Sequence, residues 1–313
     1  MKFAFWRRRR NRASGVDAAG ESRAGGVDQA GGAGGQAGSG EDRATGGEGQ
    51  SGGGEGRISR TSQAVALTRA RLERPHSPDG DPQAQARLCE GMRPTPIERL
   101  RPMLAARTRF FDQAVLTALA AGVRQVVICG AGYDDRALRF RTPGARFFEL
   151  DQGPTQADKA RRLQALGTDL SELTLATADF RRHDVAAVLA ASGHDRGRPT
   201  LFLCEGLLIY LDQPTLIGLL SGLAACAAPG SRLAASLAIH AEDRNTAEVV
   251  AAANARRRAG ETEPWRTILP RDEQLALLTQ AGWQPERVLD AAELEDSAPP
   301  GRTLLVEAGP AAG

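Results

Sequence analysis

Three acidic residues stand directly after short apolar runs: Asp151 after "ARFFEL", Asp179 after "LTLATA" and Glu205 after "PTLFLC". A fourth run, "RQVVIC", is followed by Gly130 and Gly132. The carboxyl ends of parallel strands lie at one edge of a sheet, and ligands bind in the crevice outside that edge. Acids also cap helices, but three acids on consecutive strands beside a glycine turn favour a shared ligand site. The glycines would let that ligand approach the backbone closely.

The loop after Gly130 indicates the chemistry of the ligand. Asp151 follows Gly130 by 21 positions, the spacing at which an acid meets ribose hydroxyls in dinucleotide folds. However, Asp135 replaces the third glycine of the dinucleotide fingerprint, and Asp134 and Asp135 would repel a pyrophosphate. A nucleoside with a cationic end suits this loop better, and S-adenosylmethionine has adenosine, a sulfonium and an amino-acid end. Alternatively, the two aspartates only cap the helix that follows.

A sheet must position these strand ends, and the chain beyond residue 123 alternates apolar runs with helical patterns. Seven runs are typical of strands: 124–130, 145–151, 173–180, 199–206, 231–239, 284–290 and 302–309. The first five are apolar on both faces, as in a parallel sheet covered by helices on each side. We therefore predict an α/β fold with a seven-stranded, mostly parallel sheet and helices on both faces.

Composition divides the rest of the chain. Residues 1–57 are rich in glycine and poor in large apolar side chains, which predicts a disordered tail. Residues 58–122 carry helical patterns that stop at Gly122, and 123–313 form the α/β domain with a polar helical insertion at about 240–265. The formal net charge of +2 gives no reason to expect nucleic acid as a partner. We expect a cytoplasmic protein without a membrane span. Its four cysteines are scattered without metal-like spacing, and Cys129 and Cys204, which lie in predicted strands, are expected to be buried core residues.

Several motifs together resemble a known family. "AARTRFFD", "GAGYDDRALRF", "FFELD", "ADF" and "CEGLLIYL" stand in order and at suitable distances. The set resembles the leucine carboxyl methyltransferase family of class I S-adenosylmethionine-dependent methyltransferases, and within it a bacterial branch. The resemblance covers about residues 58–308. It implies a Rossmann-like class I methyltransferase fold, with 58–122 as an N-terminal helical cap and the 240–265 insertion as a helical lid.

The resemblance also implies roles for individual residues. Arg107 would pair with the carboxylate of the cofactor's methionine end, and Gly130 and Gly132 would pack beside that end. Asp151 would bind the ribose hydroxyls. Asp179 and the backbone of Phe180 would meet the adenine, and Glu205 would be a further acid on the cofactor side. Arg109, in contrast, is expected on a solvated helix face.

The expected reaction is O-methylation of a carboxylate or hydroxyl on a small molecule or a peptide end. A carboxylate acceptor needs no base, whereas a hydroxyl acceptor would need one. Tyr210 and His240 are the candidates, although a structural role is expected for both, and His76, His183 and His194 are expected to be exposed. No metal site is predicted. A nicotinamide-dependent oxidoreductase and a non-catalytic cofactor-binding module are the alternative functions, and the oligomeric state is not predicted.

Overall fold

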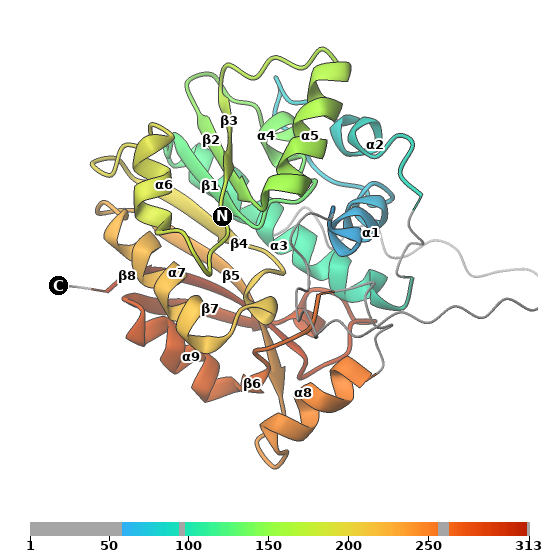
Figure 1. Ribbon diagram of the computed structural model, residues 1–313, viewed down its shortest axis with the longest axis vertical. Coiled ribbons are helices and arrows are strands. Elements are labelled where there is room, and N and C mark those ends of the chain that lie inside the picture. The colour runs from blue at the N-terminus through green and yellow to red at the C-terminus, as the bar shows by residue number, and fades with distance from the viewer. Residues whose placement is uncertain (1–57, 94–97, 256–262, 312–313) are drawn as a thin grey trace, which may run out of the picture. The chain divides into compact units, whose positions relative to one another are not determined.

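The computed structural model describes residues 58–93, 98–255 and 263–311 (Figure 1). The tail predicted at 1–57 lies outside these residues, as does the part of the predicted lid at 256–262. In the ranges that are described, no helix is long and apolar enough to cross a membrane.

One sheet organises the described chain (Figure 1). Its eight strands are β1 (Gln125–Cys129), β2 (Arg146–Asp151), β3 (Leu173–Thr177), β4 (Thr200–Cys204), β5 (Arg232–His240), β6 (Leu269–Pro270), β7 (Trp283–Asp290) and β8 (Thr303–Pro310). The order is β3-β2-β1-β4-β5-β8-β7, and β6 pairs with the far end of β5. All seven predicted strands are therefore confirmed. The short β6 was missed because two residues, one of them a proline, give no strand pattern.

The sheet is mostly parallel, as predicted. Strands β1 to β6 pair in parallel, whereas β8 runs antiparallel to both β5 and β7. The chain order reverses between β1 and β4, which are neighbours in the sheet. In an open sheet, ligands bind in the crevice at the carboxyl side of such a reversal.

Helices cover both faces of the sheet (Figure 1). The helices are α1 (Arg60–Arg69), α2 (Ala84–Leu88), α3 (Arg101–Ala120), α4 (Arg136–Arg139), α5 (Gly153–Ala165), α6 (Val185–Ala191), α7 (Gln213–Ala225), α8 (Thr246–Ala255) and α9 (Arg271–Gln280). Short 3₁₀ turns are η2 (Glu98–Leu100), η3 (Leu208–Tyr210) and η4 (Ala291–Glu293). Gly122, two residues after the last residue of α3, has a φ of 89°, a backbone conformation that favours glycine and ends the helix.

Alternation along the strands builds two apolar cores. Val127 and Cys129 of β1 point into a core shared with α6, α7 and α9, whereas Val126 and Ile128 point into a core shared with α1 to α5. Every residue of β1 and of β4 is buried. The 58–122 segment belongs to the second core, because α3 contacts β4, β5 and β8 and α1 contacts α3. Cys129 and Cys204 are buried, as expected, and Cys89 and Cys226 are buried as well.

Candidate functional site

The carboxyl ends of β1 and β4 meet at a pair of glycine turns. Gly130 follows β1 with a φ of 65°, and Gly206 follows β4 with the same φ. A Cβ atom on Gly130 would lie 2.9 Å from Cδ1 and 3.3 Å from Cβ of Leu207, so the side chain of Leu207 packs closely on this glycine. The two loops that flank the chain reversal are therefore in direct contact, and the positive φ angles favour glycine on both backbones.

Asp151 is held at the end of the neighbouring strand β2. Its Oδ2 accepts the N–H of Gly132 at 2.5 Å, and its Oδ1 accepts the N–H of Gln152 at 2.6 Å. Each oxygen keeps a further lone pair for another donor. Burial raises the pKa of this carboxyl to about 6, against the opposing effect of the two backbone donors. The sheet thus brings Asp151 and the Gly130–Gly132 turn together, as the sequence predicts.

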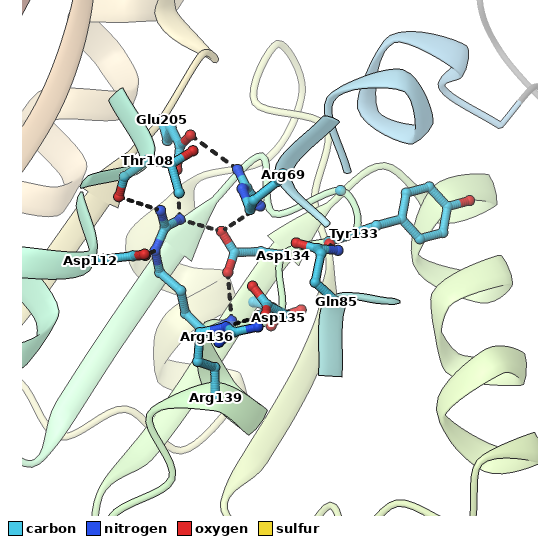
Figure 2. Close-up of polar contacts among 12 residues, drawn as sticks. Arg69, Gln85, Thr108, Asp112, Tyr133, Asp134, Asp135, Arg136, Arg139 and Glu205 are labelled. Carbon is cyan, nitrogen blue, oxygen red and sulfur yellow. Dashed lines mark hydrogen bonds and ion pairs between the residues drawn. The ribbon is translucent and has the colours of Figure 1, made fainter. Parts of the chain in front are cut away.

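Glu205, directly after β4, contacts three guanidinium groups, and Figure 2 shows those of Arg69 and Arg136. Its Oε1 accepts hydrogen bonds from Arg69 Nη2 and from Arg107 Nε, both at 3.0 Å. Its Oε2 accepts one from Arg136 Nη1 at 2.5 Å. Burial alone would raise the pKa of Glu205, but the three arginines hold it well below its usual range. Glu205 is therefore ionised, and its hydrogen bonds connect α1, α3 and α4.

The acidic loop residues Asp134 and Asp135 are part of the same network (Figure 2). Asp134 pairs with Arg136 at 2.6 Å, and its Oδ1 also accepts the N–H of Arg136 at 2.7 Å. Asp135 is fully buried between Arg74 at 2.6 Å and Arg139 at 2.7 Å.

The interpretation that these aspartates face the cationic end of a ligand is therefore wrong, because arginines of the same chain neutralise them. The alternative, that they cap the next helix, is confirmed for Asp134 by its bond to the backbone of Arg136. Asp135 makes no capping hydrogen bond.

The connected network carries an excess of positive charge. Its carboxylates are Asp112, Asp134, Asp135 and Glu205, and its guanidinium groups are Arg69, Arg74, Arg107, Arg136 and Arg139. Five positive and four negative charges leave a net charge of +1 among the residues that the structure describes. Because buried charge is costly unless it is compensated, this cluster favours an anionic ligand group.

Arg107 is a member of the network that has two unused donor groups at an accessible edge. Its Nε binds Glu205, and within the described ranges its Nη atoms make no hydrogen bond. The guanidinium packs against Gly206, where a Cβ atom would lie 2.7 Å from Nη1. The side chain is 11% exposed, which leaves an edge that a ligand can reach. A guanidinium fixed through Nε with both Nη groups available matches the two oxygens of a carboxylate.

The other end of the site differs from its prediction. Strand β3 ends at Thr177, so Asp179 lies two residues beyond it rather than at the strand end. Its carboxylate is bound by Arg181, with Nε at 3.0 Å from Oδ1 and Nη2 at 2.9 Å from Oδ2. Phe180, directly after Asp179, is half-buried and lines a cavity of about 330 Å³. The other lining residues are Arg181, His183, Asp184, Val185, Pro214, Thr215, Gly218 and Leu219.

The two candidate bases are placed differently. His240 is buried at the end of β5, where Nδ1 lies 2.7 Å from the carbonyl oxygen of Ala241 and Nε2 lies 2.9 Å from Thr246 Oγ1. Both ring nitrogens are thus engaged with neighbouring residues. Tyr210 is half-buried in η3, three residues after the Leu207 that contacts Gly130. Arg109 pairs with Glu295 on an exposed helix face, as expected.

Arg69 and Arg136, which bind Glu205 together with Arg107, were not predicted from the sequence. Arg136 directly follows the two aspartates in "DDRALRF", and this adjacency could have indicated that an arginine neutralises them. Arg69 lies 136 positions before Glu205, and nothing in the sequence pairs them. Among the described residues, no group of three or more histidine, cysteine, aspartate or glutamate side chains could hold a metal ion.

Known proteins resemble this chain in sequence and in fold. A protein from Mycolicibacterium gilvum named "Putative S-adenosyl-L-methionine-dependent methyltransferase" is 40% identical over 158 residues, which are 50% of this chain and 48% of that protein. A protein of the same name from Mycobacterium tuberculosis is 35% identical over 188 residues, 59% of this chain and 60% of the relative. The chain therefore spans about half to three fifths of the length of these relatives.

Two crystal structures share the fold. A "putative methyltransferase" from Thermobifida fusca is 17% identical with a TM-score of 0.54, and the match covers 82% of this chain and 95% of that one. A DUF574 family protein from Streptomyces avermitilis is also 17% identical, with a TM-score of 0.52, and covers 80% of this chain and 97% of that one. The model of the leucine carboxyl methyltransferase family matches residues 55–224, a stretch that contains α1 to α5, strands β1 to β4 and the whole arginine network. The chain belongs to the leucine carboxyl methyltransferase family.

Proposed function

We propose that this protein is an S-adenosylmethionine-dependent methyltransferase that binds its cofactor along the carboxyl ends of β1 to β4. One observation carries the proposal: Arg107 offers two Nη donors at the edge of a buried cluster whose net charge is +1, against Gly206, whose neighbour Leu207 contacts Gly130. The cofactor's amino-acid end has the carboxylate that this cluster lacks. The names of the relatives and the family membership support the same cofactor.

The residues fit the cofactor at three points. Arg107 would bind the carboxylate, while Glu205 holds the guanidinium in place through Nε. Asp151 would accept the ribose hydroxyls with the lone pairs that the backbone of Gly132 and Gln152 leaves over. Phe180 would offer its ring to the base at the cavity beyond β3. Both carboxylate oxygens of Asp179 are already bound by Arg181. We therefore propose that Asp179 contributes least to the free energy of cofactor binding.

When bound, S-adenosylmethionine supplies a methyl group on a positively charged sulfur. The protein's own task is then positioning, because methyl transfer requires donor and acceptor to be aligned at near-contact distance. Anchors at Arg107, Asp151 and Phe180 would fix both ends and the middle of an elongated molecule. The buried ion pairs behind Arg107 keep that anchor from moving during the reaction.

For the acceptor, we propose an oxygen nucleophile on a small molecule or a peptide end. A carboxylate fits better than a hydroxyl, because His240 has both ring nitrogens engaged and a carboxylate needs no base. Tyr210, close to the Gly130 contact in sequence, would then line the acceptor side. Helix α8, which directly follows the His240 region and is mostly exposed, would lie beside it.

The test is transfer of a labelled methyl group from S-adenosylmethionine into small molecules and peptides of a cell extract, with the product identified. Alkali separates the two acceptor classes, since it cleaves a methyl ester to volatile methanol but leaves a methyl ether intact. Arg107→Ala is the matched control, and at a low concentration of S-adenosylmethionine it should reduce incorporation roughly ten- to a hundredfold. Binding of the cofactor without transfer to any acceptor would favour the non-catalytic binding module, and failure to bind it would overturn the proposal.

A further inference from the structure

The turn that follows β3 is closed by a histidine. Ala178 N–H still pairs with the carbonyl of Asp151 at 2.8 Å, so the ladder to β2 continues one residue past the strand. The next N–H, that of Asp179, donates instead to Nδ1 of His183 at 2.9 Å. The carbonyl of Asp179 in turn accepts the N–H of His183, also at 2.9 Å. His183 therefore binds the backbone of Asp179 through both its side chain and its main chain.

This closure holds the backbone of Phe180, whose ring also packs against the apolar core. On the far side of the turn, Asp184 caps α6 by accepting the N–H of Ala186 at 2.9 Å, and Val185 is buried in the core. The turn is thus joined to the sheet at its start and to α6 at its end, and the Asp179–His183 bond ties these two ends together. Phe180 lies between the two attachments and lines the cavity together with His183 itself.

The bond has a defined chemical requirement. Because Nδ1 accepts a hydrogen bond, the ring proton must be on Nε2. Without this bond the exposed N–H of Asp179 would bind water, and the two ends of the turn would lose a link. A side chain that offers an oxygen at the position of Nδ1 can replace the imidazole, whereas one without an acceptor there cannot. Asparagine meets this requirement, since its Oδ1 is as far from the backbone as Nδ1 of histidine.

We propose that His183 is a positioning residue for the nucleoside end of the cofactor, which it serves by closing the Asp179–His183 turn and so fixing Phe180 against the base. The proposal rests on the function proposed above. His183 acts through the turn and not by contact with the reacting atoms. It was expected from the sequence to be an exposed loop residue, and it is exposed, yet its Nδ1 has a specific backbone partner.

The experiment measures dissociation constants by calorimetry on the full chain, with S-adenosylhomocysteine and with 5′-methylthioadenosine, which lacks the amino-acid end. His183→Ala should weaken both ligands by the same factor, roughly three- to tenfold, as expected for the loss of one side-chain hydrogen bond. His183→Asn should bind both ligands as the wild type does. The rescue by asparagine is the decisive feature, since general damage to the turn would lower the affinity of both variants.

Each other outcome has a separate meaning. If the wild type binds S-adenosylhomocysteine but His183→Ala binds it equally well, or His183→Asn is as weak as His183→Ala, the role of His183 is refuted and the proposed function stands. If the wild type binds neither ligand, the proposed function is refuted, and the role proposed for His183 is refuted as well. A loss confined to S-adenosylhomocysteine would place the effect at the wrong end of the cofactor and would also refute the proposal.

Discussion

The two ends of the proposed site are held in opposite ways. Around Glu205, buried ion pairs join α1, α3, α4 and the loop after β4, so segments more than a hundred residues apart in sequence fix one guanidinium. Around Phe180, the turn Asp179–His183 is held mainly by hydrogen bonds within five consecutive residues, most of them exposed. The first end is part of the folding of the protein, whereas the second is a local structure on its surface.

This difference predicts different costs for mutations. Breaking a buried ion pair leaves charges without compensation in a low-dielectric interior, and the whole fold loses stability. Breaking a bond in an exposed turn changes only the local position of a few atoms. The methionine end of the site should therefore respond to mutation in stability and affinity together, and the base end in affinity alone.

Arg136→Met should have the largest effect. The variant removes a fully buried guanidinium that pairs with Asp112, Asp134 and Glu205 and leaves three carboxylates with fewer partners. We expect the free energy of unfolding to fall by about 3–5 kcal/mol, measured by urea denaturation. Arg181→Met is the matched control in the exposed turn and should change it by less than about 0.5 kcal/mol. Equal losses in the two variants would remove the distinction between the two ends.

Arg107→Ala should come next, with its main effect on binding. Glu205 keeps Arg69 and Arg136 as partners, so the fold should survive. The loss of a charge-assisted bond of about 1.5–3 kcal/mol should weaken S-adenosylhomocysteine roughly ten- to a hundredfold. 5′-Methylthioadenosine has no carboxylate, so its affinity should not change. A similar loss for both ligands in calorimetry would show that Arg107 does not bind the carboxylate.

The affinity for S-adenosylhomocysteine should rise with pH between 5 and 7. Burial raises the pKa of Asp151 to about 6. Only the ionised carboxylate can accept both ribose hydroxyls, so binding favours deprotonation and strengthens as the pH rises through 6. At pH 5 about a tenth of the groups are ionised, which predicts roughly tenfold weaker binding than at pH 7. Asp151→Asn should bind more weakly at pH 7 and lose this dependence, and a variant that keeps the same pH profile would contradict the assignment.

Asp179→Asn should have the smallest effect. Arg181 already donates to both oxygens of this carboxylate, so Asp179 can accept only a weak additional hydrogen bond from the base. We expect S-adenosylhomocysteine to bind about threefold more weakly, with no change in the melting temperature. A loss as large as that of Arg107→Ala would mean that Arg181 releases Asp179 when the ligand binds.

The fold was largely predictable because its signals are local. Each of the first five strands is a short apolar run that ends at a polar residue or a glycine, and both faces of β1 and β4 are buried as that pattern requires. Strand β6 was not predicted, because its pairing with β5 depends on where the chain returns to the sheet and not on its own sequence. Asp151 was placed correctly because it is the last residue of its strand.

The electrostatics of the site were not predictable from the same signals. The partners of Asp135 include Arg74, which is 61 positions away, and no spacing rule connects them. The loop therefore looked unneutralised in sequence and is fully neutralised in the fold. The bond from Asp179 to His183 is local, but it uses a side-chain nitrogen as a backbone acceptor, which no propensity or periodicity predicts.

The most direct test of the central claim is a calorimetric titration of the full chain with S-adenosylhomocysteine and, separately, with a nicotinamide dinucleotide. If Arg107, Asp151 and Phe180 form one cofactor site, S-adenosylhomocysteine should bind with a stoichiometry of about one and the dinucleotide should give no heat. Tight binding of the dinucleotide together with no heat from S-adenosylhomocysteine would contradict the account.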